Sequence, residues 1–474
     1  MLNELFHIFN VFIFVYVIIV DGFYLMLFFL SFKQIQEYLK RSPYNEIKEF
    51  RLSSLTTPIS IIVPAYNEEK TISNSISSLL QINYPEFEII VVNDGSNDET
   101  IERLKNDFSL IEIPIMAVRK KIKTETVHKM YRSTKHPSLL VIDKENGGKA
   151  DSLNVGINFS TYPYFCSVDA DSMLEPDSLM KAMKPFFEGG ENVVACGGII
   201  RVINGCSVEN GYLKKVRLPK NKLAISQVIE YLRSFLMGRL GLSSLNNLLI
   251  VSGAFGIFRK HEVLEVGGYD VDNLGEDMEL IVSLQKYLYK TKSDAKVLFV
   301  PDPVCWTEVP EDLRSLAKQR TRWQVGLLQT LIKHKDTLFN PRYKSMGLLA
   351  MPYFLFVELL GPTIELLGML FVIVGLYFDL VNIPFAILYF VFTLVFGVFL
   401  SVTAILLEEY SFRKYERVSD LFRLLFYSIL ENFWFRQINA VFKTWGFIRF
   451  MRKDRRWGLQ NRKGFSQTDQ QQVM

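Results

Sequence analysis

The feature that most constrains this chain is a run of almost wholly apolar residues from Leu5 to Ser31. A helix of about 20 apolar residues spans the hydrocarbon core of a bilayer. No basic segment precedes the run and no small-residue cleavage site is apparent, so we expect a membrane anchor rather than a signal peptide. Lys33, Lys40 and Arg41 follow the run. Basic residues mark the cytoplasmic end of a span, so we expect the following chain to be cytoplasmic.

Two more apolar stretches lie near the other end of the chain, over about residues 347–378 and 384–407. The loop between them contains no Lys or Arg, whereas basic residues return after the second stretch at Arg413, Lys414 and Arg417. This asymmetry predicts two further spans joined by an external loop. Residues 419–450 are apolar and aromatic but carry charges, and a basic tail follows them, so we expect an interfacial or re-entrant pair of helices there.

The chain between these membrane segments has the pattern of an α/β domain. Short β-branched runs alternate with helical stretches, which is typical of a mostly parallel sheet with helices on both faces. Residues 124–138 are polar and basic and are predicted to form a loop, and residues 221–249 are predicted to be helical and close to the membrane. The predicted strands are Ile59–Val63, Glu88–Val92, Leu139–Ile142, Tyr164–Val168 and Val193–Ile199.

The predicted organisation therefore has seven parts. They are an N-terminal transmembrane helix (1–31), a connector (32–57), the α/β domain (58–309), an amphipathic interfacial helix (310–345), two transmembrane segments (346–408), interfacial or re-entrant helices with a basic cytoplasmic end (409–463) and a disordered tail (464–474).

Charge and cysteine content exclude some functions. Lys and Arg number 54 against 50 Asp and Glu, a formal charge of +4, which does not indicate a nucleic-acid partner. The four cysteines lack the two-residue spacing of zinc or redox motifs, so we expect buried thiols in a reducing compartment.

Acidic and polar side chains follow the first two predicted strands. Tyr66 and Glu68 lie in the segment Val63-Pro64-Ala65-Tyr66-Asn67-Glu68-Glu69, and Asp94 lies in Val92-Asn93-Asp94-Gly95-Ser96. The carboxyl ends of such strands are where α/β sheets bind ligands, and a carboxylate there can accept hydrogen bonds from a nucleobase or ribose. The glycines of a dinucleotide fingerprint are missing, so an NAD site is not expected. Ordinary turn and cap chemistry explains each segment equally well when it is taken alone.

Two carboxylates, Asp169 and Asp171, directly follow the strand Tyr164–Val168. Like charges so close repel one another unless a cation lies between them. Oxygen ligands favour Mg²⁺ or Mn²⁺, which also binds diphosphate. Lys149 follows Gly147 and Gly148 and could add a positive charge for a phosphate, and a glycine turn before a helix is the equally good alternative when this segment is taken alone.

Glu276 and Asp277 begin a predicted helix, after Gly275. Acids favour a helix N-terminus for structural reasons, but a carboxylate there can also act as a general base toward an acceptor hydroxyl. The last motif is Gln319-Arg320-Thr321-Arg322-Trp323 on the amphipathic helix. Its indole can stack on a sugar and its arginines can bind a diphosphate, whereas an interfacial tryptophan anchor is the alternative.

Taken together and in this order, these motifs resemble those of the processive membrane-bound glycosyltransferases of family 2, which include cellulose, hyaluronan, chitin and poly-N-acetylglucosamine synthases. The resemblance is strong over about residues 58–335. It rests on Asp94, Asp169-Ala170-Asp171, Glu276-Asp277 and Gln319-Arg320-Thr321-Arg322-Trp323, with further matches at Ser252-Gly253-Ala254-Phe255 and Val266-Gly267-Gly268-Tyr269. Gly275 departs from the family pattern, which has Thr before the acidic pair.

The resemblance implies a GT-A-like cytoplasmic domain and a role for each matching residue. Tyr66, Glu68 and Asp94 would bind the nucleoside, with Lys149 and Asp169 at the diphosphate. A divalent metal, Mg²⁺ or Mn²⁺, would be held by Asp169 and Asp171. Asp277, with Glu276 beside it, would be the catalytic base. The acceptor end and the leaving diphosphate would be held by Gln319, Arg322 and Trp323.

The sequence thus predicts an inverting glycosyltransferase of the cell (inner or plasma) membrane, multi-pass, with its catalytic domain in the cytoplasm. It would move N-acetylglucosamine or glucose from a UDP-sugar to a growing β-linked polysaccharide or oligosaccharide and export the product through the bilayer. Two alternatives stay open, a non-processive transferase with a lipid acceptor and a non-catalytic transporter or scaffold that binds nucleotide. No nucleic-acid partner is expected, and the sequence leaves accessory subunits open.

Overall fold

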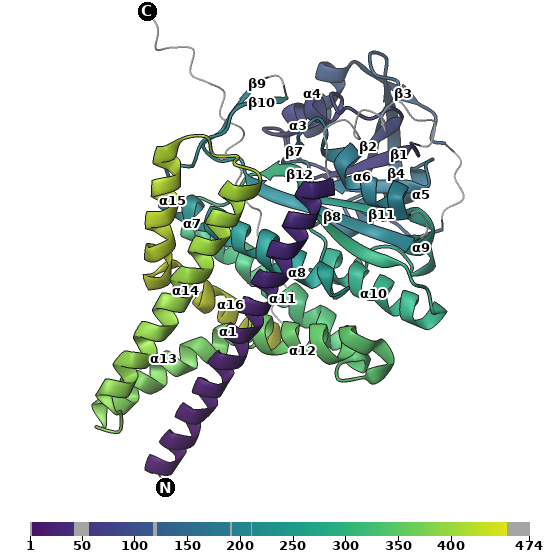
Figure 1. The fold of residues 1–474 in the computed structure, drawn as a ribbon. Coiled ribbons are helices and arrows are strands. Elements are labelled where there is room, and N and C mark those ends of the chain that lie inside the picture. The colour runs from purple at the N-terminus through teal and green to yellow at the C-terminus, as the bar shows by residue number, and fades with distance from the viewer. Residues whose placement is uncertain (1, 42–55, 117–120, 190–191, 210, 453–474) are drawn as a thin grey trace, which may run out of the picture. The chain divides into compact units, whose positions relative to one another are not determined.

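The computed structural model describes residues 2–41, 56–116, 121–189, 192–209 and 211–452. These residues divide into two compact units. The sheet unit contains the described residues of 37–220 and 248–309, and the helical unit contains residues 2–36, 221–247 and 310–452 (Figure 1).

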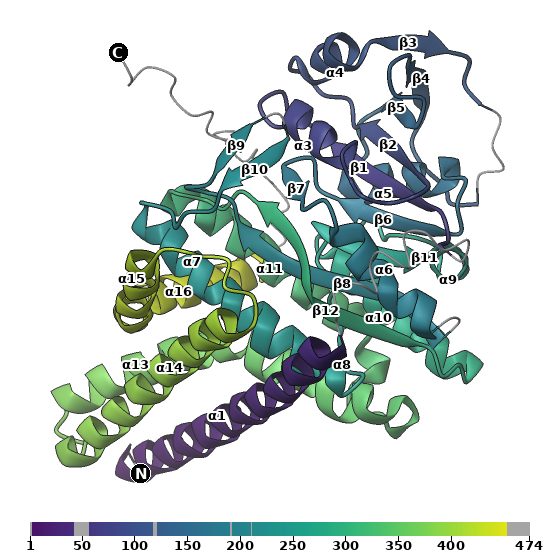
Figure 2. The same ribbon diagram turned by 45° about the horizontal axis from the view of Figure 1, so that its top comes forward.

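The described part of the sheet unit contains a ten-stranded sheet in the order β3-β4-β5-β2-β1-β6-β11-β8-β12-β7 (Figure 2). Its central strands β5, β2, β1 and β6 are parallel, whereas β11 is antiparallel to both β6 and β8. The predicted α/β class is confirmed, and the sheet is mixed where a mostly parallel one was expected. The strands are β1 (Ile59–Ala65), β2 (Phe87–Asn93), β3 (Leu110–Ile113), β4 (Val127–Ser133), β5 (Leu139–Lys144), β6 (Tyr164–Val168), β7 (Ser172–Leu174), β8 (Val193–Val202), β11 (Phe255–Arg259) and β12 (Lys296–Thr307). A separate hairpin pairs β9 (Ser207–Glu209) with β10 (Tyr212–Lys215).

Both faces of the central sheet are covered. Successive strand residues point to opposite faces, and on β2 the residues of both faces, Ile89 and Val91 as well as Ile90 and Val92, are fully buried. The helices of this unit are α3 (Ile72–Leu79), α4 (Thr100–Phe108), α5 (Lys149–Phe159), α6 (Ser178–Gly189), α9 (Lys260–Glu265) and α10 (Glu276–Thr291).

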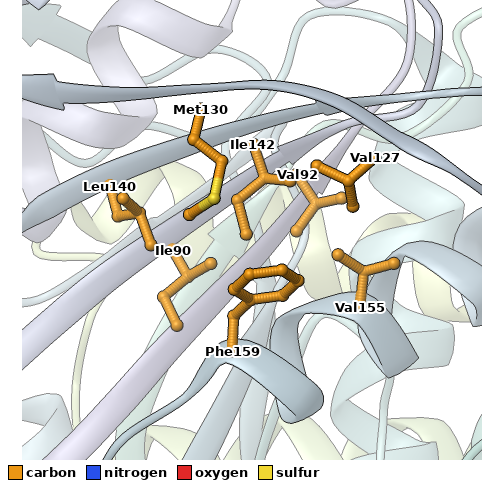
Figure 3. Packing of buried hydrophobic residues seen from close by; sticks show 8 residues of the cluster. All are labelled: Ile90, Val92, Val127, Met130, Leu140, Ile142, Val155 and Phe159. Carbon is orange, nitrogen blue, oxygen red and sulfur yellow. The ribbon is translucent and has the colours of Figure 1, made fainter. Parts of the chain in front are cut away.

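One part of the core lies between α5 and the strands β2, β4 and β5. Phe159 and Val155 of α5 face a layer of aliphatic side chains (Figure 3). Val127 and Met130 belong to this layer, so the polar segment 124–138 contains the strand β4 and the prediction of a loop there was wrong. The strand was missed because its apolar residues do not alternate regularly: His128 and Lys129 are both exposed, and the pairing with β5 shifts register between Val127 and Lys129.

The helical unit begins with residues 2–36 of α1 (Leu2–Arg41), and the last turn of this helix is assigned to the sheet unit. The predicted anchor lies within α1, but the helix continues ten residues beyond Ser31, so the expected connector over 32–57 begins later than predicted. The segment from Lys33 to Lys40 contains no glycine or proline, and its Ile35 is fully buried. Packing of this side chain explains why helix continues into a polar sequence. The rest of that connector, residues 42–55, lies outside the described residues.

Residues 221–247 pack with the helical unit, so the predicted 58–309 domain is interrupted. The helical prediction for this segment is confirmed by α7 (Lys222–Leu232), the π-helix η2 (Arg233–Arg239) and α8 (Leu240–Ser244). The amphipathic helix predicted over 310–345 is α11 (Leu313–Lys333), followed by the short 3₁₀ turns η3 (Lys335–Thr337) and η4 (Pro341–Tyr343).

In the part of the chain that the structure describes, two helices are long and apolar enough to cross a membrane, over Phe6–Lys40 and Ile383–Ser411. A third candidate is bent by 43° between Met346–Leu359 and Gly361–Tyr377. The apolar stretch predicted over 384–407 is thus one helix, and the stretch predicted over 347–378 is a broken helix. Its pieces are η5 (Met346–Ala350), α12 (Met351–Tyr353), η6 (Phe354–Leu359) and α13 (Gly361–Tyr377), followed by α14 (Ile383–Ser411).

The helix pair predicted over 419–450 consists of α15 (Val418–Leu430) and α16 (Phe435–Met451), separated by the 3₁₀ turn η7 (Glu431–Phe433). Its predicted location at the membrane interface stays a prediction, and the predicted disordered tail, 464–474, lies outside the described residues.

All four cysteines, Cys166, Cys196, Cys206 and Cys305, are buried thiols of the sheet unit. Burial raises the pKa of three of them, Cys166, Cys196 and Cys305, above the ordinary thiol value.

Candidate functional site

The loops after β1 and β2 are hydrogen-bonded to each other. The two strands are parallel and in register, so both loops leave the same edge of the sheet. The Asn67 N–H donates to Ser96 Oγ at 3.0 Å, and the Asn97 N–H donates to Asn67 Oδ1 at 2.8 Å. Asn67 has a φ of 56°, in the left-handed region that asparagine tolerates better than most residues. Tyr66, which directly follows β1, is 37% exposed.

Glu68 is held inside the same pair of loops. Its N–H donates to Thr100 Oγ1 at 2.8 Å, and its Oε2 accepts from Thr71 Oγ1 at 2.8 Å. The structure therefore brings Tyr66 and Glu68 to the predicted edge, with Glu68 partly committed to holding the loop.

Asp94 is buried at the end of β2. Its carboxylate pairs with the Lys144 ammonium and accepts the backbone N–H groups of Gly147, at 2.9 Å, and Gly148, at 2.8 Å. The Asn146 side chain also donates to it, at 3.2 Å. Asp94 is thus joined to the glycine segment 145–148 that precedes α5.

Lys149, the first residue of α5, lies among three predicted site acids. Its ammonium is 2.6 Å from Asp169 Oδ1 and 3.5 Å from Glu276 Oε1. Burial lowers the pKa of Lys149, but Asp169, Glu276 and then Asp277 raise it, and the result is a pKa above the ordinary lysine value. The ammonium therefore supplies positive charge among acids that would otherwise repel one another.

Asp277 lies in the first turn of α10, beside the same lysine. Its Oδ2 accepts the Gly253 N–H at 3.2 Å and its Oδ1 accepts the Met278 N–H at 2.8 Å. A Cβ on Gly253 would lie 2.8 Å from Lys149 Nζ and 3.7 Å from Asp277 Cβ, so the backbone here approaches both side chains closely. The half-buried carboxylate keeps unused lone pairs with which it could accept a proton.

Asp171 is buried directly after Asp169, and it accepts a hydrogen bond from Ser172 Oγ at 3.3 Å. Among the described residues, no three His, Cys, Asp or Glu side chains are grouped as a closed metal site would need. The donor set nevertheless fits a hard cation, because Mg²⁺ in nucleotide sites is held by one or two carboxylates together with substrate phosphates.

The last predicted motif lies on α11 of the helical unit. Trp323 is 39% exposed, and the guanidinium carbon of Arg320 lies 4.4 Å from the centre of its ring. Gln319 Oε1 and Arg322 Nε are buried and have no hydrogen-bond partner within the described residues. Buried polar atoms are rarely left unpaired, so these two are candidates to bind a ligand.

The sequence of the sheet unit and the start of the helical unit decides the family. Residues 57–326, more than half of the chain, match the family described as "Glycosyltransferase like family 2". The chain belongs to this family. The family 2 match includes every predicted site residue, from Tyr66 to Trp323.

Curated relatives of this family 2 chain are poly-beta-1,6-N-acetyl-D-glucosamine synthases. The protein from Staphylococcus epidermidis is 28% identical over 314 residues, covering 66% of this chain and 65% of the relative. The one from Staphylococcus aureus (strain COL) is 27% identical over 341 residues, which cover 70% of this chain and 68% of the relative. The matched region thus spans just under two thirds of the S. epidermidis relative.

A solved structure with the same fold is a mannosyltransferase from Pyrobaculum calidifontis in complex with GDP-Man and Mn²⁺. The likeness has a TM-score of 0.54 at 17% identity and covers 89% of this family 2 chain and 98% of the other. This likeness supports the GT-A-like fold.

Sequence reasoning did not single out four residues that lie against a predicted motif of their own unit. Lys144 and Asp151 form buried ion pairs beside the glycine segment, and the Gly253 backbone contacts Asp277. Glu230 binds Arg320 of the α11 motif. Asp151 lies two residues after Lys149, and Gly253 lies in the matched segment Ser252-Gly253-Ala254-Phe255, whereas no local pattern marks Lys144 or Glu230.

Proposed function

We propose that this chain is an inverting, processive glycosyltransferase that transfers N-acetylglucosamine from a UDP-sugar to a growing β-linked polysaccharide. The observation that carries this proposal is the group formed by Asp169, Glu276 and Asp277 around Lys149 at the strand ends of the sheet unit. Such an arrangement of acids and a cation suits a nucleotide diphosphate and a base. The names of the curated relatives favour N-acetylglucosamine as the sugar.

The chain's own residues can be given roles in a single displacement. Tyr66 and Glu68 bind the nucleoside at the strand ends, and Lys149 binds the diphosphate through its ammonium. Asp169 and Asp171 would hold a Mg²⁺ or Mn²⁺ ion, which would supply positive charge to the leaving diphosphate. The solved mannosyltransferase of this fold was determined with Mn²⁺, which favours such an ion here.

Asp277 acts as the general base. It accepts the proton of the acceptor hydroxyl as that oxygen forms a bond to the anomeric carbon and the bond to the diphosphate breaks. Attack from the face opposite the leaving group inverts the centre, so an α-linked donor gives a β-linkage. Glu276, next to Asp277, keeps Lys149 in the site through their ion pair.

The acceptor is assigned to the motif on α11. Gln319, Arg322 and Trp323 would hold the end of the growing chain and the leaving diphosphate, with the indole beneath the acceptor sugar. The apolar helices α1 and α14 support a multi-pass protein in the cell membrane, with the sheet unit in the cytoplasm and the polymer leaving through the bilayer.

The first experiment replaces Asp277 with Asn in the full-length protein and measures UDP release from UDP-N-acetylglucosamine in membranes. Removal of a general base lowers kcat by about 10²–10⁴-fold. The exposed Asp294→Asn in the same unit is the matched control and should keep wild-type turnover. Equal turnover in the Asp277 variant would refute the base assignment.

A second experiment decides between polymer synthesis and its alternatives. Purified protein is incubated with a panel of labelled UDP-sugars, and the products are separated by length. Long products from UDP-N-acetylglucosamine are expected. A short glycolipid alone would favour the non-processive transferase, and UDP binding without turnover of any sugar would favour a scaffold.

A further inference from the structure

The Lys144 ammonium is buried between two carboxylates that also lie out of solvent. Lys144 ends β5, and its side chain has no exposed surface. It pairs with Asp94 at the end of β2 and, at 2.8 Å, with Asp151 in the first turn of α5. The side chains of the two acids are only 4% and 6% exposed. Buried charges are costly and need a full set of partners, so this group requires a structural or functional explanation.

The Asp94 carboxylate has all of its acceptor positions in use. One oxygen accepts from Lys144 and the Gly147 N–H, and the other accepts from the Gly148 N–H and the Asn146 side chain. A carboxylate offers about four lone-pair sites. Asp94 therefore binds the glycine segment, and binding a nucleobase through this carboxylate would require one of these contacts to break.

Asp151 holds the other end of the glycine segment. Its Oδ2 accepts the Glu125 N–H at 3.0 Å, and its carboxyl carbon would lie 2.9 Å from a Cβ on Gly147. Gly148 has a φ of 89°, in the region that favours glycine. The segment thus passes closely between Asp94 and Asp151, and Lys144 joins the two acids.

The next residue along the chain is Lys149. Because Lys149 starts α5 directly after Gly148, the position of its ammonium depends on how residues 145–148 are held. We propose that Lys144 is a positioning residue: by pairing with Asp94 and Asp151, it fixes the glycine segment and thereby places Lys149 against Asp169 and Glu276. This inference rests on the proposed function, in which Lys149 binds the donor diphosphate.

A double-mutant cycle tests whether Lys144 acts through Lys149. The variants Lys144→Met, Lys149→Ala and the double variant are compared for UDP affinity by calorimetry and for donor KM and kcat. Each single variant should raise the UDP Kd and donor KM about tenfold, with a smaller change in kcat. The Kd and KM of the double variant should lie within about twofold of those of whichever single variant binds UDP less tightly. Independent effects, roughly 100-fold in the double variant, would overturn the proposal.

The matched control is Lys181→Met, which removes another partly buried ion pair of the sheet unit, 2.8 Å from Lys181 Nζ to Asp302. It should leave UDP affinity unchanged. A tenfold loss in this control as well would mean that the Lys144 effect is general destabilisation, which would overturn the proposal.

Two further measurements test the proposal in two cases that the cycle does not cover: a Lys144 variant that folds poorly, and a wild-type protein that does not bind UDP. Lys144→Met leaves two buried carboxylates without a cation, so the neutral variant Asp94→Asn/Lys144→Met/Asp151→Asn is made alongside it. Wild-type UDP affinity in this folded variant would refute the role of the group. Hydrogen exchange of peptides covering residues 144–151 needs no nucleotide, and it should be faster in Lys144→Met and unchanged in Lys181→Met.

Failure of the two proposals can be told apart. Absence of polymer from the wild-type protein refutes the proposed function. In that case, hydrogen exchange at residues 144–151 and the double-mutant cycle of UDP affinity still decide the role of Lys144. Unchanged exchange in the Lys144 variant refutes the positioning role even if the wild-type protein makes polymer.

Discussion

The guanidinium of Arg320 forms a bidentate ion pair with the carboxylate of Glu230, with both N–O distances at 2.7 Å. Arg320 is 1% exposed, and it also lies over the ring of Trp323. Both partners belong to the helical unit, on α11 and α7. The ion pair therefore fixes a cation against one face of the indole, and Trp323 remains 39% exposed, as the proposed stacking on an acceptor sugar requires.

Replacing Glu230 with Gln should destabilise the helical unit and loosen Trp323. Loss of a hydrogen-bonded charge at a buried arginine costs about 2 kcal/mol. We expect a lower thermal midpoint and a higher KM for an oligosaccharide acceptor, with less change in donor KM. Glu209→Gln is the control, because its pair with Lys214 is exposed and such pairs contribute about 0–1 kcal/mol. An unchanged acceptor KM in the Glu230 variant would contradict the role assigned to the pair.

Replacing Gly253 with Ala should displace the Lys149 ammonium without unfolding the protein. The added Cβ would lie 2.8 Å from Lys149 Nζ, the flexible end of that side chain, and the lysine can move away at little cost in stability. Donor KM should rise by roughly tenfold while the thermal midpoint changes little. Gly238→Ala serves as the control, since the nearest atom to its Cβ is 3.9 Å away. Wild-type kinetics in the Gly253 variant would show that this position of Lys149 is not needed.

Replacing Gly156 with Ala should instead reduce stability. The added Cβ would lie 2.2 Å from Ile62 Cγ2, where α5 packs closely on β1. Overpacking of a core costs about 1–3 kcal/mol, so the thermal midpoint should fall. Combining it with Ile62→Ala should make the double variant more stable than the sum of the two single effects predicts. Additive losses would argue against this close contact.

The charge of Lys149 should contribute to stability at all pH values near neutrality. Its pKa in the folded protein is raised by the site acids, so the contribution is complete below the unfolded pKa and is lost as the pH rises through the folded pKa. The difference in thermal midpoint between wild type and Lys149→Met should stay constant from about pH 7 to about pH 9. Scanning calorimetry across this range tests the sign. A difference that disappears near pH 8 would mean that the lysine loses its proton there.

The elements with a strong local pattern could be predicted from the sequence. Strands β1, β2, β5, β6 and β8 are short apolar runs that contain β-branched or aromatic residues, and all five were predicted. By contrast, β12 was missed because Pro301 and Pro303 interrupt its sequence. Its pairing with β8 shifts register between Val300 and Val304, which lets the strand continue past both prolines.

The site could be predicted in part for the same reason. Asp169, Glu276 and Asp277 follow a strand or begin a helix, so their place at one edge follows from the topology. Lys144 lies 50 residues from Asp94, and Glu230 lies 90 residues from Arg320. Pairings at such separations depend on tertiary packing, which no local pattern in the sequence reports.

The burial of all four cysteines makes the native chain suitable for site-specific labelling. A thiol reacts as its thiolate, and burial disfavours that form at Cys166, Cys196 and Cys305. Maleimide reagents should therefore modify a single cysteine introduced on the surface far faster than the native thiols. Fluorescent or spin probes on α11 could then follow movements of its motif, Gln319–Trp323, without first removing any natural cysteine.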